Sequence, residues 1–104
     1  MNTAARESSA VRVARALGDP TRFRLLREIA LGAETSCRDL TAKMRIAQAT
    51  VSHHLRVLSE AGLVRAREEG HYHWYSVRRE AIAEHAKAVT EAFGRARHGK
   101  GRAR

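Results

Sequence analysis

The sequence contains very little cysteine or proline, and it has no long apolar segment. One of its 104 residues is cysteine and one is proline. The single cysteine, Cys37, excludes an internal disulfide framework and suits a reducing compartment. Because Pro20 is the only proline, no proline-rich linker divides the chain, and its length allows one domain. Without eighteen consecutive apolar residues or the apolar core of a signal peptide, the chain is expected to be cytoplasmic and to make no membrane contact.

The sequence also lacks the motifs of the common enzyme classes. It contains no G-x-S-x-G nucleophile turn, no phosphate-binding P-loop, no H-E-x-x-H metal motif and no glycine-rich dinucleotide fingerprint. A small helical domain has no room for a large substrate cleft. We therefore predict a protein that is not an enzyme and carries no cofactor.

Positive charge is the main feature of the composition. Twenty Lys and Arg against eleven Asp and Glu give a formal net charge of +9, and the sequence pI is about 11.2. A domain this basic is typical of nucleic-acid binders. Residues 95–104 hold five of the positive charges and no acid, which predicts a disordered basic tail. The rest is expected to form a flexible N-terminal segment, 1–9, and one folded domain, 10–94.

Apolar spacing and capping residues predict three helices in the first half of the folded domain. The first covers residues 10–17. The second follows Asp19, a favourable N-cap with proline next to it, and stops before Gly32. The third is short, is capped by Ser36 and reaches about Met44.

The segment 52–64 has the pattern of a helix that packs on one side and contacts a ligand on the other. Val51, Leu55 and Leu58 recur at i, i+4 and i+7, so they form one apolar stripe. The opposite face offers donors for base edges and phosphates in a DNA major groove. Its polar residues are Ser52, His53 and Arg56. Only three residues separate this helix from the preceding one, as in a helix-turn-helix, although Ala47 is a weak N-cap.

The stretch 63–77 predicts a β-hairpin, because β-favouring residues lie on both sides of Glu69 and Gly70. A hairpin directly after such a helix is a wing. The wing residues expected to reach phosphates or a minor groove are Arg67, His71 and His73. An amphipathic helix closes the domain, with an apolar stripe at Ile82, Ala86, Val89 and Phe93. The expected fold is mainly α with a small β-hairpin, a winged helix-turn-helix in the order α-α-α-α-β-β-α.

Three segments together resemble the ArsR/SmtB group of bacterial winged-helix transcriptional repressors. They are ALGDPTRFRLLREI (16–29), ATVSHHLRVLSEAGLV (49–64) and GHYHWYSV (70–77), within a resemblance that covers roughly residues 10–93. Members of this family are homodimers that pair through their first and last helices and bind palindromic operators, and the resemblance implies the same here. By resemblance, the DNA-contacting residues of the helix-turn-helix are Gln48, Thr50, Ser52, His53 and Arg56.

The resemblance does not extend to the metal sites of the family. Where the arsenic, cadmium and lead sensors carry ELCVCDL, this chain has ETSCRDL, in which Ser36 and Arg38 replace both ligand cysteines. A soft metal needs several thiolates, and arginine adds repulsive charge. The zinc, cobalt and nickel sensors use D-x-H and H-x-x-H or E on the last helix. Here Glu84 and His85 are adjacent, and His98 falls on a different helix face, so neither kind of metal site is predicted.

The other histidines and the cysteine have simpler interpretations. His71 and His73 lie two apart on a predicted strand and so share one face. Two imidazoles are an incomplete metal site, so exposed wing residues near phosphates are the favoured interpretation. His54 lies beside the apolar stripe and is expected to be partly buried. Cys37 is expected to be an inert, half-buried thiol, because one cysteine cannot close an intrachain disulfide.

These observations predict a sequence-specific DNA-binding transcriptional regulator, most simply a repressor, that binds a palindromic operator as a homodimer. Since the usual metal ligands are missing, the signal is expected to come from a regulatory protein partner that engages segment 1–9 or the basic tail. Three alternatives stay open. They are a repressor that responds to a metal or thiol signal at a non-standard site, a protein-interaction adaptor on a winged-helix scaffold, and a non-specific architectural DNA binder.

Overall fold

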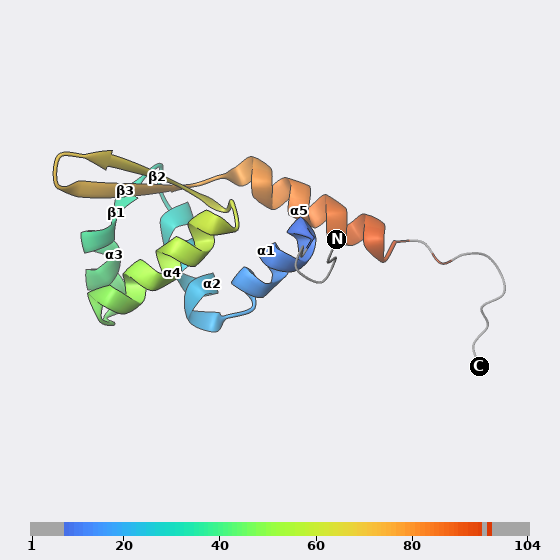
Figure 1. Cartoon of the computed structure of the whole chain (residues 1–104), viewed down its shortest axis with the longest axis horizontal. Helices are drawn as coiled ribbons and strands as arrows, with labels where there is room; N and C mark the ends of the chain where they lie inside the picture. Colours follow the sequence, from blue (N-terminus) through green and yellow to red (C-terminus); the bar gives the residue numbers. More distant parts are fainter. Residues whose placement is uncertain (1–7, 95, 97–104) are drawn as a thin grey trace, which may run out of the picture.

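The computed structural model describes residues 8–94 and 96, which form five helices and a small antiparallel sheet (Figure 1). In chain order the elements are α1 (Ser9–Leu17), α2 (Pro20–Ala30), β1 (Thr35–Ser36), α3 (Cys37–Met44), α4 (Gln48–Glu60), β2 (Val64–Glu69), β3 (Tyr72–Val77) and α5 (Arg79–Ala92). The sheet covers one side of α3 and α4, and α5 extends away from it above α1 (Figure 1). The predicted order of four helices, a hairpin and a closing helix is confirmed.

The sheet has three strands in the order β1–β3–β2, where the sequence predicted only two. Strand β1 pairs antiparallel with β3, with Thr35 opposite Tyr75 and Ser36 opposite Trp74. A strand of two residues has no periodicity that a sequence pattern can detect, and its partner lies far along the chain. The extra strand connects the start of α3 to the hairpin, so the hairpin is supported at its base.

The hairpin turns one residue later than the sequence predicted. Glu69 still pairs with Tyr72 in the ladder, which leaves a two-residue loop of Gly70 and His71. Gly70 has φ +61° at the first loop position, a conformation that glycine adopts without steric cost. The expectation that His71 and His73 share one strand face is therefore wrong, because His71 belongs to the turn.

Three helices begin at a residue whose side chain caps them, and the sequence predicted two of these caps, Asp19 and Ser36, but not Ser8. In each, the side-chain oxygen of the cap accepts a hydrogen bond from the backbone N–H three residues later, at 3.2 Å for Ser8, 2.9 Å for Asp19 and 3.0 Å for Ser36. With this cap α1 begins at Ser9, inside the segment 1–9 that was expected to be flexible. Residues 1–7 lie outside the described residues, as do residues 95 and 97–104 of the predicted basic tail.

Helix α4 begins without a side-chain cap and is held by its packing. The turn before it contains Arg45, which ends α3 in the left-handed conformation with φ 59°. Ala47 occupies the N-cap position with no side-chain hydrogen bond. The stripe of Val51, Leu55 and Leu58 is at most 1% exposed, so the core orients the helix.

The hydrophobic core lies among α1 to α4 and the start of β2. Its largest fully buried side chains are Leu25, Ile29, Leu40, Val51, Leu55, Leu58 and Leu63. Helix α5 has no fully buried residue, and only Ala81 and Ile82 of its apolar side chains pack against the core. The core therefore fixes the helix-turn-helix firmly and leaves much of α5 uncovered.

The missing cap of α4 predicts a stabilising substitution. Ala47 already has the extended conformation of an N-cap, with φ −61° and ψ 142°, so Ala47→Ser should add the cap hydrogen bond without rearrangement. We expect an increase of about 1 kcal/mol in the free energy of unfolding. Urea unfolding at one protein concentration measures it, because oligomerisation makes stability concentration-dependent. The matched control is Ala49→Ser inside the helix, which should give no increase; equal gains from both variants would contradict the capping explanation.

Candidate nucleic-acid interface

Helix α4 presents a polar surface on the side opposite its buried stripe. Gln48, Thr50, His53 and Arg56 are exposed, and Ser52 is half-buried. The arrangement follows from helix periodicity, because anchoring Val51, Leu55 and Leu58 in the core turns the intervening positions outward. These exposed groups combine amide, hydroxyl, imidazole and guanidinium donors, which can pair with base edges and phosphates.

A groove of about 960 Å³ lies between α3, α4 and the hairpin. Of the eight residues predicted to contact DNA, it brings five together: Gln48, Ser52, Arg56, His71 and His73. Thr50 and His53 are exposed on α4 beside the groove but do not line it. The groove also includes Arg38 from the first turn of α3. The sequence analysis considered this residue only as the replacement for a metal-binding cysteine. Its position in the first helix of the helix-turn-helix was the signal that could have identified it.

Ser52 contacts the helix before it as well as facing the groove. Its Oγ lies 3.9 Å from Sγ of Cys37, the first residue of α3. Cys37 is half-buried, as the sequence predicted. Both residues line the groove, so the contact between the two helices of the helix-turn-helix lies at its surface.

Arg67 lies apart from the other predicted residues. It occupies the face of β2 opposite the groove, across from Trp74, with its guanidinium 5.9 Å from the centre of the Trp74 ring. The guanidinium donates to both carboxylate oxygens of Glu34 at 2.9 and 2.8 Å and to Glu69 at 3.0 Å. The hydrogen bond from Arg67 lowers the pKa of the Glu34 carboxyl, and the same pairing raises the pKa of Arg67. The strand alternation and this paired carboxylate direct Arg67 away from a ligand in the groove.

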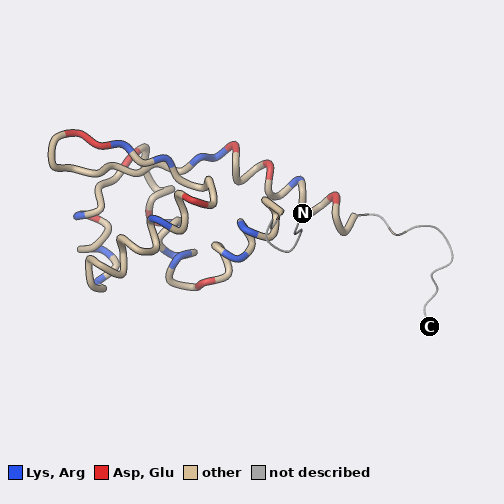
Figure 2. Tube along the Cα trace, in the orientation of Figure 1, with Lys and Arg blue, Asp and Glu red and all other residues tan. Residues whose placement is uncertain are grey.

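The end of the wing carries acidic as well as imidazole groups. Figure 2 shows acidic positions on β2 just before the turn, and these are Glu68 and Glu69. Nδ1 of His73 lies 3.6 Å from a carboxylate oxygen of Glu68, and both side chains are exposed. The positive charge beside the groove therefore comes mainly from the helices, through Arg38 and Arg56.

The residues considered as metal ligands do not assemble. His71 and His73 occupy a turn and a strand, and Cys37 is flanked by Ser36 and Arg38. Within residues 8–94 and 96, no three His, Cys, Asp or Glu side chains are grouped so that they could hold a metal ion. In the same part of the chain, no helix has the length and apolar content needed to cross a bilayer.

Two helices joined by a three-residue turn, with the second exposing its polar face beside a β-hairpin, define a winged helix-turn-helix DNA-binding protein. Comparison with known proteins agrees. A profile described as a helix-turn-helix domain matches residues 17–67. An uncharacterised HTH-type transcriptional regulator of Methanocaldococcus jannaschii is 34% identical over 82 residues, which are 79% of this chain and 92% of the relative. The chain spans 46–63% of the length of three further curated regulators that it matches.

Two solved structures share the architecture. A possible transcriptional regulator for arsenical resistance is 32% identical, with a TM-score of 0.68 over 79% of this chain and 83% of that one. The homodimeric winged helix-turn-helix domain of a possible ArsR-family regulator from Mycobacterium bovis is 25% identical, with a TM-score of 0.67 over 89% and 88%. The chain belongs to the ArsR/SmtB family of winged helix-turn-helix transcriptional regulators. It is a DNA-binding transcriptional regulator from a family of repressors, and not an enzyme.

Proposed function

We propose that this protein represses transcription by binding a palindromic operator as a homodimer, with α4 in the major groove. The observation that carries the proposal is the orientation of α4, whose apolar stripe is buried while its polar residues face outward beside the groove. A major groove admits an α-helix, and side chains near the start of that helix reach the base edges. A two-fold dimer presents two such helices to half-sites about one helical turn apart.

The proposed contacts divide into two kinds. Gln48, Thr50, Ser52, His53 and Arg56 contact base edges or the adjacent phosphates from α4. Arg38 on α3, with His71 and His73 on the wing, contacts phosphates that pass along the groove. Arg67 reaches DNA only if it releases Glu34, so we assign the wing contacts to the histidines.

Arg56 should control sequence preference. It is exposed on α4 and lines the groove, and an arginine fork on guanine contributes about 1–3 kcal/mol of discrimination. We expect selection from a random duplex library to return an inverted repeat, and Arg56→Ala to lose preference at one position of each half-site. Deleting residues 95–104 is the control, because removing five tail charges should lower affinity for all duplexes alike. An unchanged preference in Arg56→Ala, or loss of all preference with competitor DNA, would contradict the proposal.

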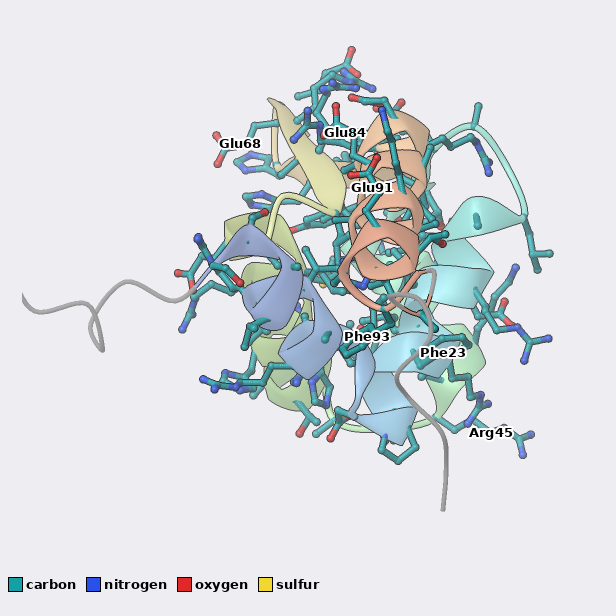
Figure 3. The ribbon with its side chains drawn as sticks, turned by 90° about the vertical axis from the view of Figure 1, so that its right-hand side faces the viewer. Phe23, Arg45, Glu68, Glu84, Glu91 and Phe93 are labelled. Carbon is teal, nitrogen blue, oxygen red and sulfur yellow. The ribbon has the colours of Figure 1, made fainter. Side chains whose placement is uncertain are left out.

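The surface that pairs two copies lies on α5. Ile82, Ala86, Val89 and Phe93 share one face of this helix, and Phe93 is 84% exposed. In Figure 3, Glu84 and Glu91 lie on one side of α5, whereas Phe93 lies on the other, the side toward which Phe23 also lies. A helix with a solvated acidic side and an uncovered apolar side needs a partner.

The spacing of the stripe allows an antiparallel copy to cover it. Its members are separated by four, three and four residues, and this pattern is unchanged when the helix is reversed. A second α5 running the other way then places Phe93 against Ile82 and Val89 against Ala86. An apolar groove of about 370 Å³ between α2 and α5, lined by Phe23, Leu26, Val77 and Ile82 among others, lies where Phe93 of the second copy arrives. Such a contact uses the same patch on both chains, as two-fold symmetry requires.

Charge substitutions test both the surface and its register. Ala86→Lys and Val89→Glu should each sediment as a monomer, because an unpaired charge faces an apolar side chain in both halves of the interface. A mixture of the two variants should form a heterodimer, in which lysine meets glutamate. Lys87→Glu, on the solvated side, is the control and should remain dimeric. Dimeric single variants would exclude this surface, and a monomeric mixture would exclude this register.

The proposed regulator does not sense metal through the sites used elsewhere in its family. A signal must bind the DNA-competent and incompetent dimers with different affinity. The ligand cysteines of the family are absent from ETSCRDL, and its D-x-H and H-x-x-H or E pattern is absent from α5. We infer instead a regulatory protein partner that engages residues 1–9 or the basic tail, a composition suited to recruitment.

Calorimetric titration tests the metal-blind proposal. Zinc, nickel, cobalt and cadmium should each show no sub-micromolar binding to the purified protein and no effect on its DNA affinity. One tight ion per chain that releases DNA, with loss of binding in Cys37→Ser or His85→Ala, would overturn it. Such a result would instead support the alternative of a metal- or thiol-responsive repressor.

A further inference from the structure

One arginine side chain connects three helices behind the recognition surface. The guanidinium of Arg22, on α2, donates from Nε to the carbonyl of Ala16 at 2.8 Å and from Nη2 to the carbonyl of Arg15 at 3.4 Å. Its Nη1 lies 3.2 Å from Nδ1 of His54 on α4. The backbone N–H of the same residue donates to Asp19, the N-cap of α2. Arg22 therefore joins the last turn of α1 to the helix that carries the proposed DNA contacts.

The contact with His54 requires a neutral imidazole. A guanidinium has only donors and stays charged, so Nδ1 must accept and the ring proton must be on Nε2. Protonated His54 would instead direct an N–H at the guanidinium, which opposes two donors and two positive charges. The Arg22–His54 contact exists in one protonation state only.

The surroundings of His54 favour that neutral state. Its ring is half-buried, as the sequence predicted, and burial is the main cause that lowers its pKa. Arg22 from α2 and His53 from α4 lower the pKa further, and Asp19 at the start of α2 opposes them. The last turn of α1 contributes the carbonyl oxygens that hold Arg22. Neutral His54 therefore stabilises the folded chain above its ordinary pKa of about 6.5, and this contribution is lost as the pH falls below that value.

We propose that Arg22 is a positioning residue that holds the recognition helix through neutral His54, and that protonation of His54 releases the helix and weakens DNA binding. The inference rests on the proposed function, because it concerns the orientation of α4 on DNA. It also gives α1, which packs against the dimerisation helix α5, a direct connection to the DNA-contacting surface.

The direction in which protonation changes DNA affinity distinguishes His54 from the other histidines. His53, His71 and His73 are exposed at the proposed interface, where added positive charge favours phosphate binding. Protonation of His54 acts in the opposite direction. Comparison with a variant that cannot titrate at position 54 isolates its contribution.

His54→Asn provides that variant, because its amide oxygen can accept from Arg22 near the position of Nδ1 and does not titrate. Affinity is measured for a duplex selected by the wild-type protein at pH 7.5, at constant ionic strength, between pH 7.5 and 5.5. The ratio of wild-type Kd to His54→Asn Kd should rise by about threefold or more as the pH falls over this range. The rise should not exceed about tenfold per pH unit, because binding is linked to the titration of one proton. Parallel pH profiles would overturn the proposal.

Arg22→Lys tests the connection itself. Lysine keeps the charge but has one ammonium group, which cannot span the α1 carbonyls and His54 as the planar fork does. We expect weaker DNA binding at pH 7.5 and loss of the acid-sensitive component. Arg24→Lys, on the same helix, is the matched control, since the Arg24 side chain is exposed and makes no hydrogen bond or ion pair with the described residues. Equal effects of the two substitutions would contradict a positioning role.

Measurements on the free protein separate this inference from the proposed function. Nitrogen NMR of wild-type imidazoles should show Nδ1 of His54 unprotonated at pH 7.5, and urea unfolding should show the wild type losing stability relative to His54→Asn below about pH 6.5. Failure to select any duplex would overturn the proposed function. The measurements on the free protein would still show whether neutral His54 accepts a hydrogen bond from Arg22. A proton on Nδ1 at pH 7.5 would overturn the contact whether or not DNA binds.

Discussion

The burial of one face of α4 is the constraint on which the rest of the structure depends. Val51, Leu55 and Leu58 are almost fully enclosed. Burying each such side chain contributes roughly 1.5–3 kcal/mol, whereas one good base contact contributes about 1–3 kcal/mol. Three buried side chains therefore outweigh any single contact with DNA. The core, and not the ligand, decides which residues of α4 face outward, and a weak cap at Ala47 is tolerated for the same reason.

Ion pairs within the fold also explain why the wing carries less free positive charge than its place beside the helix-turn-helix suggests. Arg67 is held by Glu34 from the loop before β1 and by Glu69 from its own strand, so its charge is compensated on the outer face of the sheet. Exposed ion pairs contribute little stability, but a two-point contact with a carboxylate fixes direction. Among the described residues, the arginines that line the groove are Arg38 and Arg56, on the two helices of the helix-turn-helix.

Helix α5, in contrast to α4, leaves much of its apolar side uncovered. A chain of this size buries a limited core, and α5 contributes no fully buried residue to it. Phe23, Val89 and Phe93 are 49%, 39% and 84% exposed, which is apolar surface that a second copy can cover. Because α1 contacts both α5 and, through Arg22, helix α4, the proposed pairing surface and the proposed DNA surface share a physical connection.

Features with a local signature could be predicted from the sequence by itself. Helix spacing predicted the buried stripe and the polar face of α4, the capping residues Asp19 and Ser36 predicted the starts of α2 and α3, and the β-favouring run predicted the wing. The tertiary structure decided which distant residues meet. The third strand, the pairing of Arg67 with Glu34, the groove position of Arg38 and the contact of Arg22 with His54 all join segments far apart in the chain. Periodicity specifies the face on which a side chain lies, but partners across the fold are chosen only when the elements pack together.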